Sequence, residues 1–286
     1  MAEDNDNVVE QEIAEGAPAK KQPPVPMESE TLRSVTFLAA ALPLIEEIVA
    51  SDAALQKKVS GWNCAIQFKV KNDIPAAYVL FEKGTVSVKQ GTHDKPVITM
   101  TFKNCADMNG FFTGKMILPK ISGMSHLIIL MTFLMKMMMK MKMLMPEYKC
   151  KTEEEKLLKV RMMLYMVAFA LQEMSRGGDD YIYRLTKTAR KKIIEWTVNQ
   201  EEPAVHVRID EGDIKATKGK TKRRPYVGMD FKDLDAALKV LSSEVGALDA
   251  TRQQLVSFRG TAEYGIKVGN LMTRVGNLLM PVEEEK

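Results

Sequence analysis

The chain has 286 residues and a net charge of +4, and its length suits two ordinary domains. Three cysteines without a Cys-x-x-Cys pair argue against a disulfide framework and a zinc knuckle, and no segment offers the run of about 18 uncharged apolar residues that a membrane-spanning helix needs. The opening residues are acidic where a secretory signal is basic, so we expect a cytoplasmic protein, with peripheral association to a membrane left open.

Residues 1–30 form an acidic segment. They hold eight acids against Lys20 and Lys21, a net charge of −6 that leaves +10 on the rest of the chain. Residues 17–26, APAKKQPPVP, are rich in proline, and the apolar content is low. Such a segment cannot bury enough surface to offset its loss of conformational entropy, so we predict a disordered tail.

A first domain is predicted over residues 31–145. It opens with a helix at about residues 32–50 and continues with half-buried strands, whose alternation is clear at Val86, Ser87, Val88 and Lys89. An apolar strand follows at residues 97–102, then a helix from residue 105, a closing strand that ends at Gly123, and a helix at about residues 125–145. Pro146 cannot continue that helix, so residues 146–153 are predicted to be a linker.

A second domain is predicted over residues 154–280. Its opening helix covers about residues 154–175, and its later elements are a strand at residues 226–231, a helix at 234–241, a strand at 255–260 and a final helix at about 262–280. Residues 281–286 form an acidic C-terminal tail.

The two domains repeat each other at a spacing of 128 residues, which becomes 129 after a one-residue insertion. The aligned pairs include Pro75 with Pro203, Gly84 with Gly212, Gly91 with Gly219, Pro96 with Pro225 and Phe102 with Phe231. Apolar positions, turn glycines and prolines recur together, which indicates a tandem duplication.

Each copy resembles the sterol carrier protein type 2 family in having a glycine hairpin, an apolar strand, an aspartate-containing helix and a closing strand that ends in glycine before an apolar helix. The resemblance implies an α+β fold of two tandem sterol-carrier-like domains, each a largely antiparallel sheet of about five strands covered by helices. It also implies an apolar tunnel for a sterol, fatty acyl or quinone type of lipid. The stretch from Gly114 to Gly123 is shorter than is usual in the family, so we expect a short or displaced last strand in the first copy.

Residues 124–145, MSHLIILMTFLMKMMMKMKMLM, predict a helix that is apolar almost all round until Lys136. The last helix of the second copy instead has a polar face with Lys267 and Arg274, so the methionine-rich helix needs an additional partner. Four candidates stay open: the opening helix of the second copy, a ligand cavity, a membrane interface, and Cu(I), which suits thioethers although alternate helical positions point apart.

The predicted ligand-binding residues are apolar positions near the end of each copy. Met131, Leu134, Met135 and Met138 share a helical stripe that we predict to face the ligand, and we expect the larger cavity in the first copy. The full set is Phe111, Phe112, Met116, Leu127, Leu130, Met131, Leu134, Met135, Met138, Leu238, Leu241, Phe258 and Leu271.

The densest positive cluster is Lys218, Lys220, Lys222, Arg223 and Arg224, which we predict to be a patch for an anionic head group. No nucleic-acid partner is expected, because the cluster lacks interleaved aromatic residues. The three histidines are far apart in sequence and belong to no catalytic motif, so we expect no enzyme activity, no cofactor and no metal.

The sequence therefore predicts intracellular binding or transport of a hydrophobic, lipid-like ligand in an apolar cavity. The alternative is a non-catalytic accessory or scaffold subunit that presents hydrophobic intermediates to a membrane-associated enzyme. The expected partners are accordingly the hydrophobic small molecule, with a membrane surface or an enzyme as a further partner.

Overall fold

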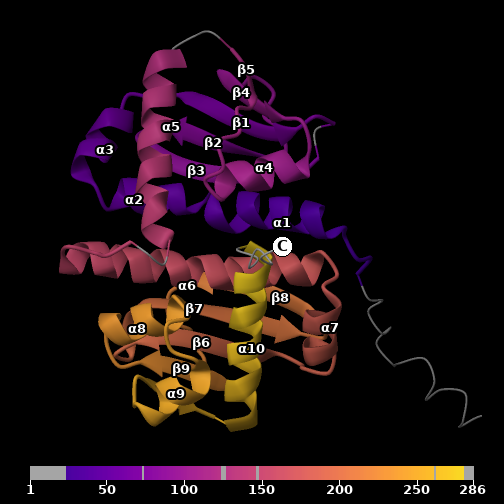
Figure 1. Cartoon of the computed structure of the whole chain (residues 1–286), viewed down its shortest axis with the longest axis vertical. Coiled ribbons are helices and arrows are strands. Elements are labelled where there is room, and N and C mark those ends of the chain that lie inside the picture. Colours follow the sequence, from indigo (N-terminus) through magenta and orange to yellow (C-terminus); the bar gives the residue numbers. More distant parts are fainter. Residues whose placement is uncertain (1–23, 73, 124–126, 146–147, 261, 280–286) are drawn as a thin grey trace, which may run out of the picture.

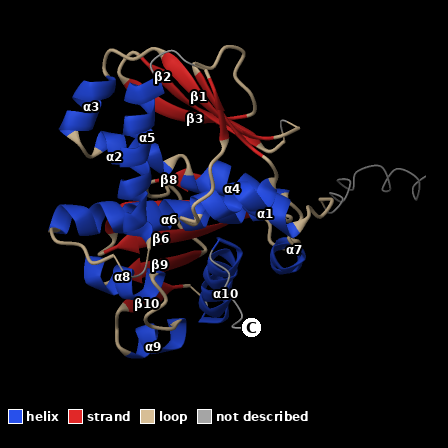
Figure 2. Cartoon of the chain, turned by 45° about the horizontal axis from the view of Figure 1, so that its top comes forward, coloured by secondary structure: helices blue, strands red, loops and turns tan. Residues whose placement is uncertain are grey.

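The computed structural model describes residues 24–72, 74–123, 127–145, 148–260 and 262–279. Within them the chain forms two five-stranded sheets, each with its own helices (Figure 1). Helices α1 (Ser29–Thr36) and α6 (Glu153–Arg176) lie between the two sheets, as two views show (Figure 1 and Figure 2). The architecture is α+β, and the chain divides into a first half and a second half at the start of α6.

The first half runs in the order helices, sheet strands, helix, strand and helix. Its further elements are the π-helix η1 (Phe37–Ala41), α2 (Leu44–Ala50), α3 (Ala53–Val59), β1 (Cys64–Val70), β2 (Ala76–Glu82), β3 (Thr85–Gln90), β4 (Ile98–Phe102), α4 (Cys105–Phe112), β5 (Lys120–Ser122), α5 (Leu127–Met141) and the 3₁₀ helix η2 (Lys142–Leu144). Strand β5 has only three residues, which confirms the expected short last strand.

The second half repeats that order. After α6 it contains α7 (Asp180–Thr186), β6 (Lys192–Val198), β7 (Glu201–Asp210), β8 (Asp213–Lys218), β9 (Val227–Phe231), α8 (Leu234–Leu241), α9 (Ala247–Arg252), β10 (Val256–Arg259) and α10 (Ala262–Leu279). The short helices α3, α7 and α9 were not expected from the sequence.

Both sheets are mixed: three of the four strand pairings in each are antiparallel, in line with the expectation of largely antiparallel sheets, and one is parallel. The strand orders are β3-β2-β1-β4-β5 and β8-β7-β6-β9-β10, so the two sheets have the same topology. In each sheet the third and fourth strands of that order, β1 with β4 and β6 with β9, pair in parallel. Strand β3 lies at one edge of the sheet and runs in the same direction as β1. The chain then crosses the sheet and forms β4 on the other side of β1, again in the direction of β1.

A buried polar side chain holds each crossing segment. Gln67 accepts a hydrogen bond from the backbone N–H of His93 at 2.7 Å through its Oε1, and Glu195 accepts one from Thr221 at 2.7 Å in the same way. Gln67 and Glu195 are 128 residues apart, as are His93 and Thr221. The two halves therefore share a specific contact as well as a strand order.

The opening helix is interrupted near Pro43, where the sequence predicted one continuous helix. The N–H of Leu42 bonds to the carbonyl of Phe37 at 2.9 Å, which is a π-helical turn, and Pro43 has no N–H to continue the pattern. The side-chain amide of Gln90 donates to the carbonyl of Leu38 at 3.0 Å and so satisfies an acceptor that the π turn leaves.

Helix α6 joins the two halves. It packs against α1, η1 and α2 of the first half and against β7 and β8 of its own sheet, and it meets the methionine-rich segment at η2. The opening segment, and not α5, is thus the partner that runs along α6. Helix α5 instead packs Phe133 against Trp62 and Phe81, with ring centroids 5.1 and 5.4 Å apart.

The described chain begins within the predicted acidic tail. The N–H of Met27 donates to the carbonyl of Gly177 at 2.9 Å, and α1 starts at Ser29, so residues 24–30 are part of the fold. Residues 1–23 and 280–286 lie outside the described residues, as do 146–147 of the predicted linker. Among described helices, none alone has the length and apolar character to cross a bilayer, although residues 29–50 and 53–59, bent by 103°, meet that test as a pair.

Candidate functional site

The predicted aromatic ligand residues of the first half belong to its core. Phe112 stacks on Phe37 at 5.3 Å between centroids, and Phe111 packs against Phe102 at 5.2 Å. These contacts fix α4 on the inner face of the first sheet. Met116, which was predicted to join them, is instead fully exposed on the segment between α4 and β5.

The predicted methionine stripe is divided between the core and the solvent. Leu134 is buried, Met138 is half-buried, and Met135 is 59% exposed. The core-facing residues of α5 are Phe133, Leu134 and Met137, so the inner face is centred one residue away from the predicted stripe. The side chains of Leu127, Leu130 and Met131 lie outside the described residues.

The predicted ligand residues of the second half line its own core. Leu271 on α10 is buried, and Leu238, Leu241 and Phe258 are half-buried against the same apolar cluster. The ring of Phe258 lies so close to Gly265 that a Cβ there would meet it at 3.1 Å. Those predicted residues whose side chains the structure describes therefore do not line one cavity shared by the two halves.

The predicted basic patch is divided by the fold. Lys218 is ion-paired with Glu47 at 2.8 Å and Glu46 at 3.3 Å, both from the first half. Lys220 donates to the carbonyl of Gln200 at 2.6 Å and lies 3.6 Å from the Glu201 carboxylate. The remaining members, Lys222, Arg223 and Arg224, are exposed in the segment before β9.

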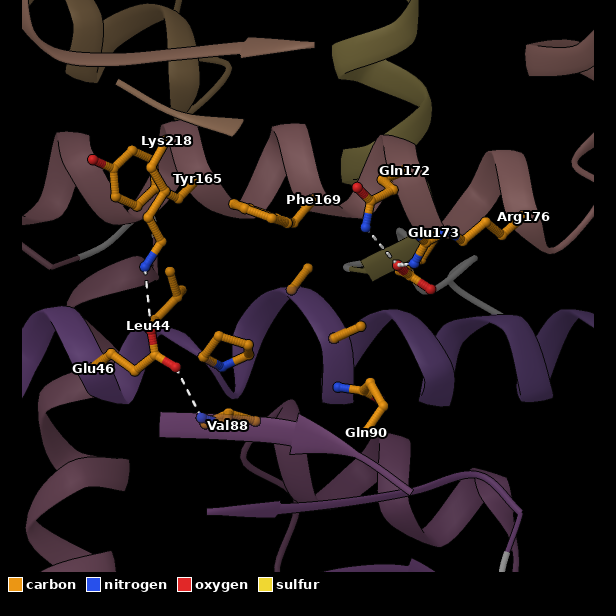
Figure 3. A pocket seen from close by; sticks show the side chains of 13 residues that line it. Leu44, Glu46, Val88, Gln90, Tyr165, Phe169, Gln172, Glu173, Arg176 and Lys218 are labelled. Carbon is orange, nitrogen blue, oxygen red and sulfur yellow. Dashed lines mark hydrogen bonds and ion pairs between the residues drawn. The ribbon is translucent and has the colours of Figure 1, made fainter. Parts of the chain in front are cut away.

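A cleft of about 280 Å³ lies between the two halves (Figure 3). Its walls are η1, α2 and β3 on one side and α6 with Lys218 of β8 on the other. Figure 3 shows Leu44 and Val88 facing Phe169 across an apolar centre, with polar side chains at both ends.

The charged side chains of this cleft are already engaged in holding the fold. Arg176 pairs with Glu173 at 2.8 Å, and Lys218 pairs with Glu46 and Glu47. Burial alone would lower the pKa of Lys218, but Glu47 and Glu46 outweigh burial and the pKa is raised. Glu46 also accepts from the N–H of Val88 at 2.8 Å on the edge strand β3. The cleft is therefore a joint with balanced charges.

A larger hollow of about 850 Å³, which we call the lysine groove, lies at one edge of the first sheet. Its lining includes four lysines against one aspartate, a net charge of +3, together with hydroxyl groups and an apolar wall. The lining residues are Lys69, Lys71, Asn72, Thr99, Thr101, Phe102, Lys103, Asp107, Ile117, Leu118, Pro119, Lys120 and Ser122.

Strand pairing assembles the lysine groove from three separate parts of the sequence, residues 69–72, 99–107 and 117–122. Thr101 of β4 is paired with Lys69 of β1 on one side and with Lys120 of β5 on the other. The N–H of Lys71 donates to the carbonyl of Phe102 at 2.9 Å, which joins the ends of β1 and β4. The sequence reasoning missed these lysines, because only the pairing of β4 with β1 on one side and with β5 on the other brings them together. The outward alternation of Lys69 and Lys71 was the one available signal.

The second half has different side chains at the same place. At the repeat spacing Thr197 replaces Lys69 and Asp230 replaces Thr101. The carboxylate of Asp230 is satisfied within the fold, since it accepts from the Thr197 hydroxyl at 2.6 Å and from the N–H of Gln200 at 2.6 Å. The lysine groove is thus a feature of the first half that the repeat does not share.

The described histidines and cysteines have ordinary contacts. His206 Nδ1 lies 2.8 Å from the carbonyl of Gly219, and the ring of His93 packs edge-on against Tyr78 at 5.0 Å. His126 lies outside the described residues. Burial raises the pKa of the Cys64 thiol, which makes a reactive thiolate less accessible. Within the described residues, no three His, Cys, Asp or Glu side chains are grouped so that they could hold a metal ion.

No protein-family model matches the sequence, and a comparison with curated proteins finds no relative. Among solved structures, Sterol Carrier Protein 2 from Yarrowia lipolytica matches at 12% identity and a TM-score of 0.31, over 40% of this chain and 92% of its own length. The sterol carrier protein domain 2 of Helicoverpa armigera matches at 13% identity and a TM-score of 0.29, over 46% and 96%. A stereoselective inverting sec-alkylsulfatase from Pseudomonas sp. matches at 10% identity and a TM-score of 0.24, over 53% of this chain and 30% of its own length.

Proposed function

We propose that the chain binds an amphipathic, lipid-like molecule with an anionic head group, without transforming it, and that the lysine groove holds this ligand. The observation that carries the proposal is the net charge of +3 in the lining of the groove, directly beside the apolar wall of Ile117, Leu118 and Pro119. The volume of about 850 Å³ lies within the range of roughly 300–1,000 Å³ that is usual for ligand sites.

The two walls of the groove suit the two ends of such a molecule. Ammonium groups of Lys71 and Lys103 offer charge-assisted hydrogen bonds to a phosphate or carboxylate, and the hydroxyl of Thr101 adds a neutral donor. An acyl chain that lies along Ile117 and Leu118 is removed from water, which contributes roughly 25 cal/mol for each Å² buried. Anionic head and apolar tail are therefore recognised together.

We further infer that the two halves are copies of one sterol-carrier-like domain that have diverged in this role. The shared strand order and the equivalent contacts of Gln67 and Glu195 support the duplication. The replacement of Thr101 by Asp230 supports the divergence, because a carboxylate at that position opposes an anionic ligand.

Neutralising two lysines of the groove tests the proposal. Lys71→Gln with Lys103→Gln removes two exposed ammonium groups and should weaken the binding of monomeric dodecyl phosphate about thirtyfold by titration calorimetry, at about 1 kcal/mol for each charge. The matched control is Lys222→Gln with Lys232→Gln, which makes the same change in net charge on the second half.

The control variant should bind as the parent does. Raising the salt concentration should weaken the binding of dodecyl phosphate by the parent and by the control. It should change the binding by the groove variant less, because the charges that salt screens are those of the groove. A parent that does not bind dodecyl phosphate, or a groove variant that binds it unchanged, overturns the proposal.

A further inference from the structure

The edge of the first sheet that bears the lysine groove also carries exposed apolar side chains. Met116 is 99% exposed and Leu118 is 91% exposed, and they are the two most exposed large apolar residues among those described. Ile74, at the turn between β1 and β2, is 78% exposed. Exposed apolar groups that gather at one place commonly mark a surface of interaction.

The exposure of Met116 and Leu118 is built into the fold by the residue between them. Ile117 packs its side chain against Gly110, where a Cβ would collide with Ile117 Cδ1. The N–H of Lys115 donates to the carbonyl of Gly110 at 2.8 Å and holds the start of the segment on α4. The N–H of Ile117 also donates to the carbonyl of Lys115 at 2.8 Å and closes a tight turn around Met116, so Met116 projects from the fold while Ile117 packs inward.

Strand pairing places these apolar residues among lysines. The N–H of Lys71 bonds to the carbonyl of Phe102, so the turn that carries Ile74 lies beside the end of β4. Strand β5 starts at Lys120 opposite Thr101, so the segment with Met116 and Leu118 reaches the same edge. The resulting edge surface consists of Ile74, Met116 and Leu118 with Lys71, Lys103, Lys115 and Lys120.

We propose that this edge surface docks on an anionic lipid bilayer. The apolar side chains enter the interfacial layer, while the lysines lie at the level of the lipid phosphates. Anionic headgroups attract each nearby lysine, and the attraction falls off within a Debye length, so the surface and the lipids are complementary in charge. The proposal rests on the proposed function, because docking would bring the mouth of the lysine groove to the membrane that supplies or receives its ligand.

The equivalent edge of the second half has different side chains, which supports a defined orientation of the protein on the bilayer. At the repeat spacing Glu202 replaces Ile74 and Asn199 replaces Lys71. Acidic side chains at the equivalent edge are repelled by anionic lipids. The bilayer therefore meets the first half and avoids the corresponding edge of the second.

The experiment removes apolar groups that do not line the groove. Met116→Ser with Ile74→Ser takes away one Met and one Ile of the edge surface and leaves the lining lysines and Leu118 in place. Met139→Ser with Ile266→Ser is the matched control, because it removes the same two residue types from exposed positions on α5 and α10. Thermal midpoints of both variants, measured first, establish that they are folded.

Co-sedimentation with vesicles of phosphatidylcholine that contain phosphatidylserine is then measured for parent and variants. We expect the edge variant to bind the vesicles about tenfold more weakly, with unchanged binding of monomeric dodecyl phosphate, and the control to match the parent. Docking is overturned if the parent does not bind the vesicles, or if it binds pure phosphatidylcholine vesicles equally well. It is also overturned if the edge variant and the control lose binding equally. If the vesicle results hold while dodecyl phosphate does not bind, the proposed function fails and docking stands.

Discussion

Thr101→Asp transfers a residue of the second half into the lysine groove. Thr101 is paired with Lys69 and Lys120, so the new carboxylate would lie between two lysines whose Cβ atoms are about 5 Å from its own by cross-strand geometry. A bound anionic head roughly 6 Å away would be repelled by about 1.4 kcal/mol at an effective dielectric constant of about 40. Binding should therefore weaken about tenfold.

Stability should move in the opposite direction. The new carboxylate adds a favourable interaction with the two flanking lysines, as Asp230 does with Thr197 and Gln200 in the second half, so the free energy of unfolding should rise by up to about 0.5 kcal/mol. The assays are titration with dodecyl phosphate and urea unfolding. Ser87→Asp is the control, since it adds the same charge on the outer face of β3, away from the groove. Unchanged binding in Thr101→Asp, or an equal loss in Ser87→Asp, would refute the reasoning.

Three further predictions concern the forces that hold the helices and the two halves together. Asp179 caps α7, is buried, and accepts from Arg274 of α10 at 2.9 and 3.2 Å, so Arg274→Met should lower the free energy of unfolding by about 2 kcal/mol in urea. Lys140 of α5 makes the equivalent pair with the cap residue Asp52 at 2.7 Å in a more exposed setting, so Lys140→Met should lower the free energy of unfolding by only about 0.5 kcal/mol. Equal losses at the two sites would contradict this ranking. Lys140 lowers the pKa of Asp52 by hydrogen bonding, so this pair stabilises the fold above the ordinary aspartate pKa, and the stabilisation is lost as the pH falls through the lowered pKa. Lys140→Met should therefore make the free energy of unfolding depend less on pH in the acid range. An unchanged acid dependence would count against the pair. Because the pKa of Lys218 is raised, its ion pairs stabilise the joint between the halves below the ordinary lysine pKa, and this stabilisation is lost as the pH rises through the raised pKa. Lys218→Met should therefore remove the alkaline dependence of the thermal midpoint. A retained dependence would assign it to other groups.

The order of elements was accessible from the sequence, because it depends on local signals. Alternation, turn glycines and the spacing of 128 residues predicted strands and helices close to those observed. The interruption of the opening helix was signalled by Pro43, but the π turn before it depends on the carbonyl of Leu38 finding Gln90, which lies 52 residues away. Such a contact follows only from the folded arrangement.

The candidate site was less accessible for two physical reasons. The helix with Met135 and Met137 is apolar nearly all round, so its composition does not say which side meets the core. Charge clustering along the sequence pointed to Lys218 and its neighbours, yet Lys218 is engaged by Glu46 and Glu47 of the other half. The lysines that gather around a hollow are distant in sequence and meet through the pairing of β4 with β1 and with β5.

The most direct test of the central claim is an amide NMR titration of the full chain with monomeric dodecyl phosphate. The account predicts that the largest shifts fall on Thr99, Thr101 and Lys120 in the lysine groove. It predicts small shifts for Phe169 and Gln172 in the cleft between the halves. Shifts concentrated in the cleft, or at the turn of Lys222 and Arg223, would contradict the assignment of the ligand to the groove.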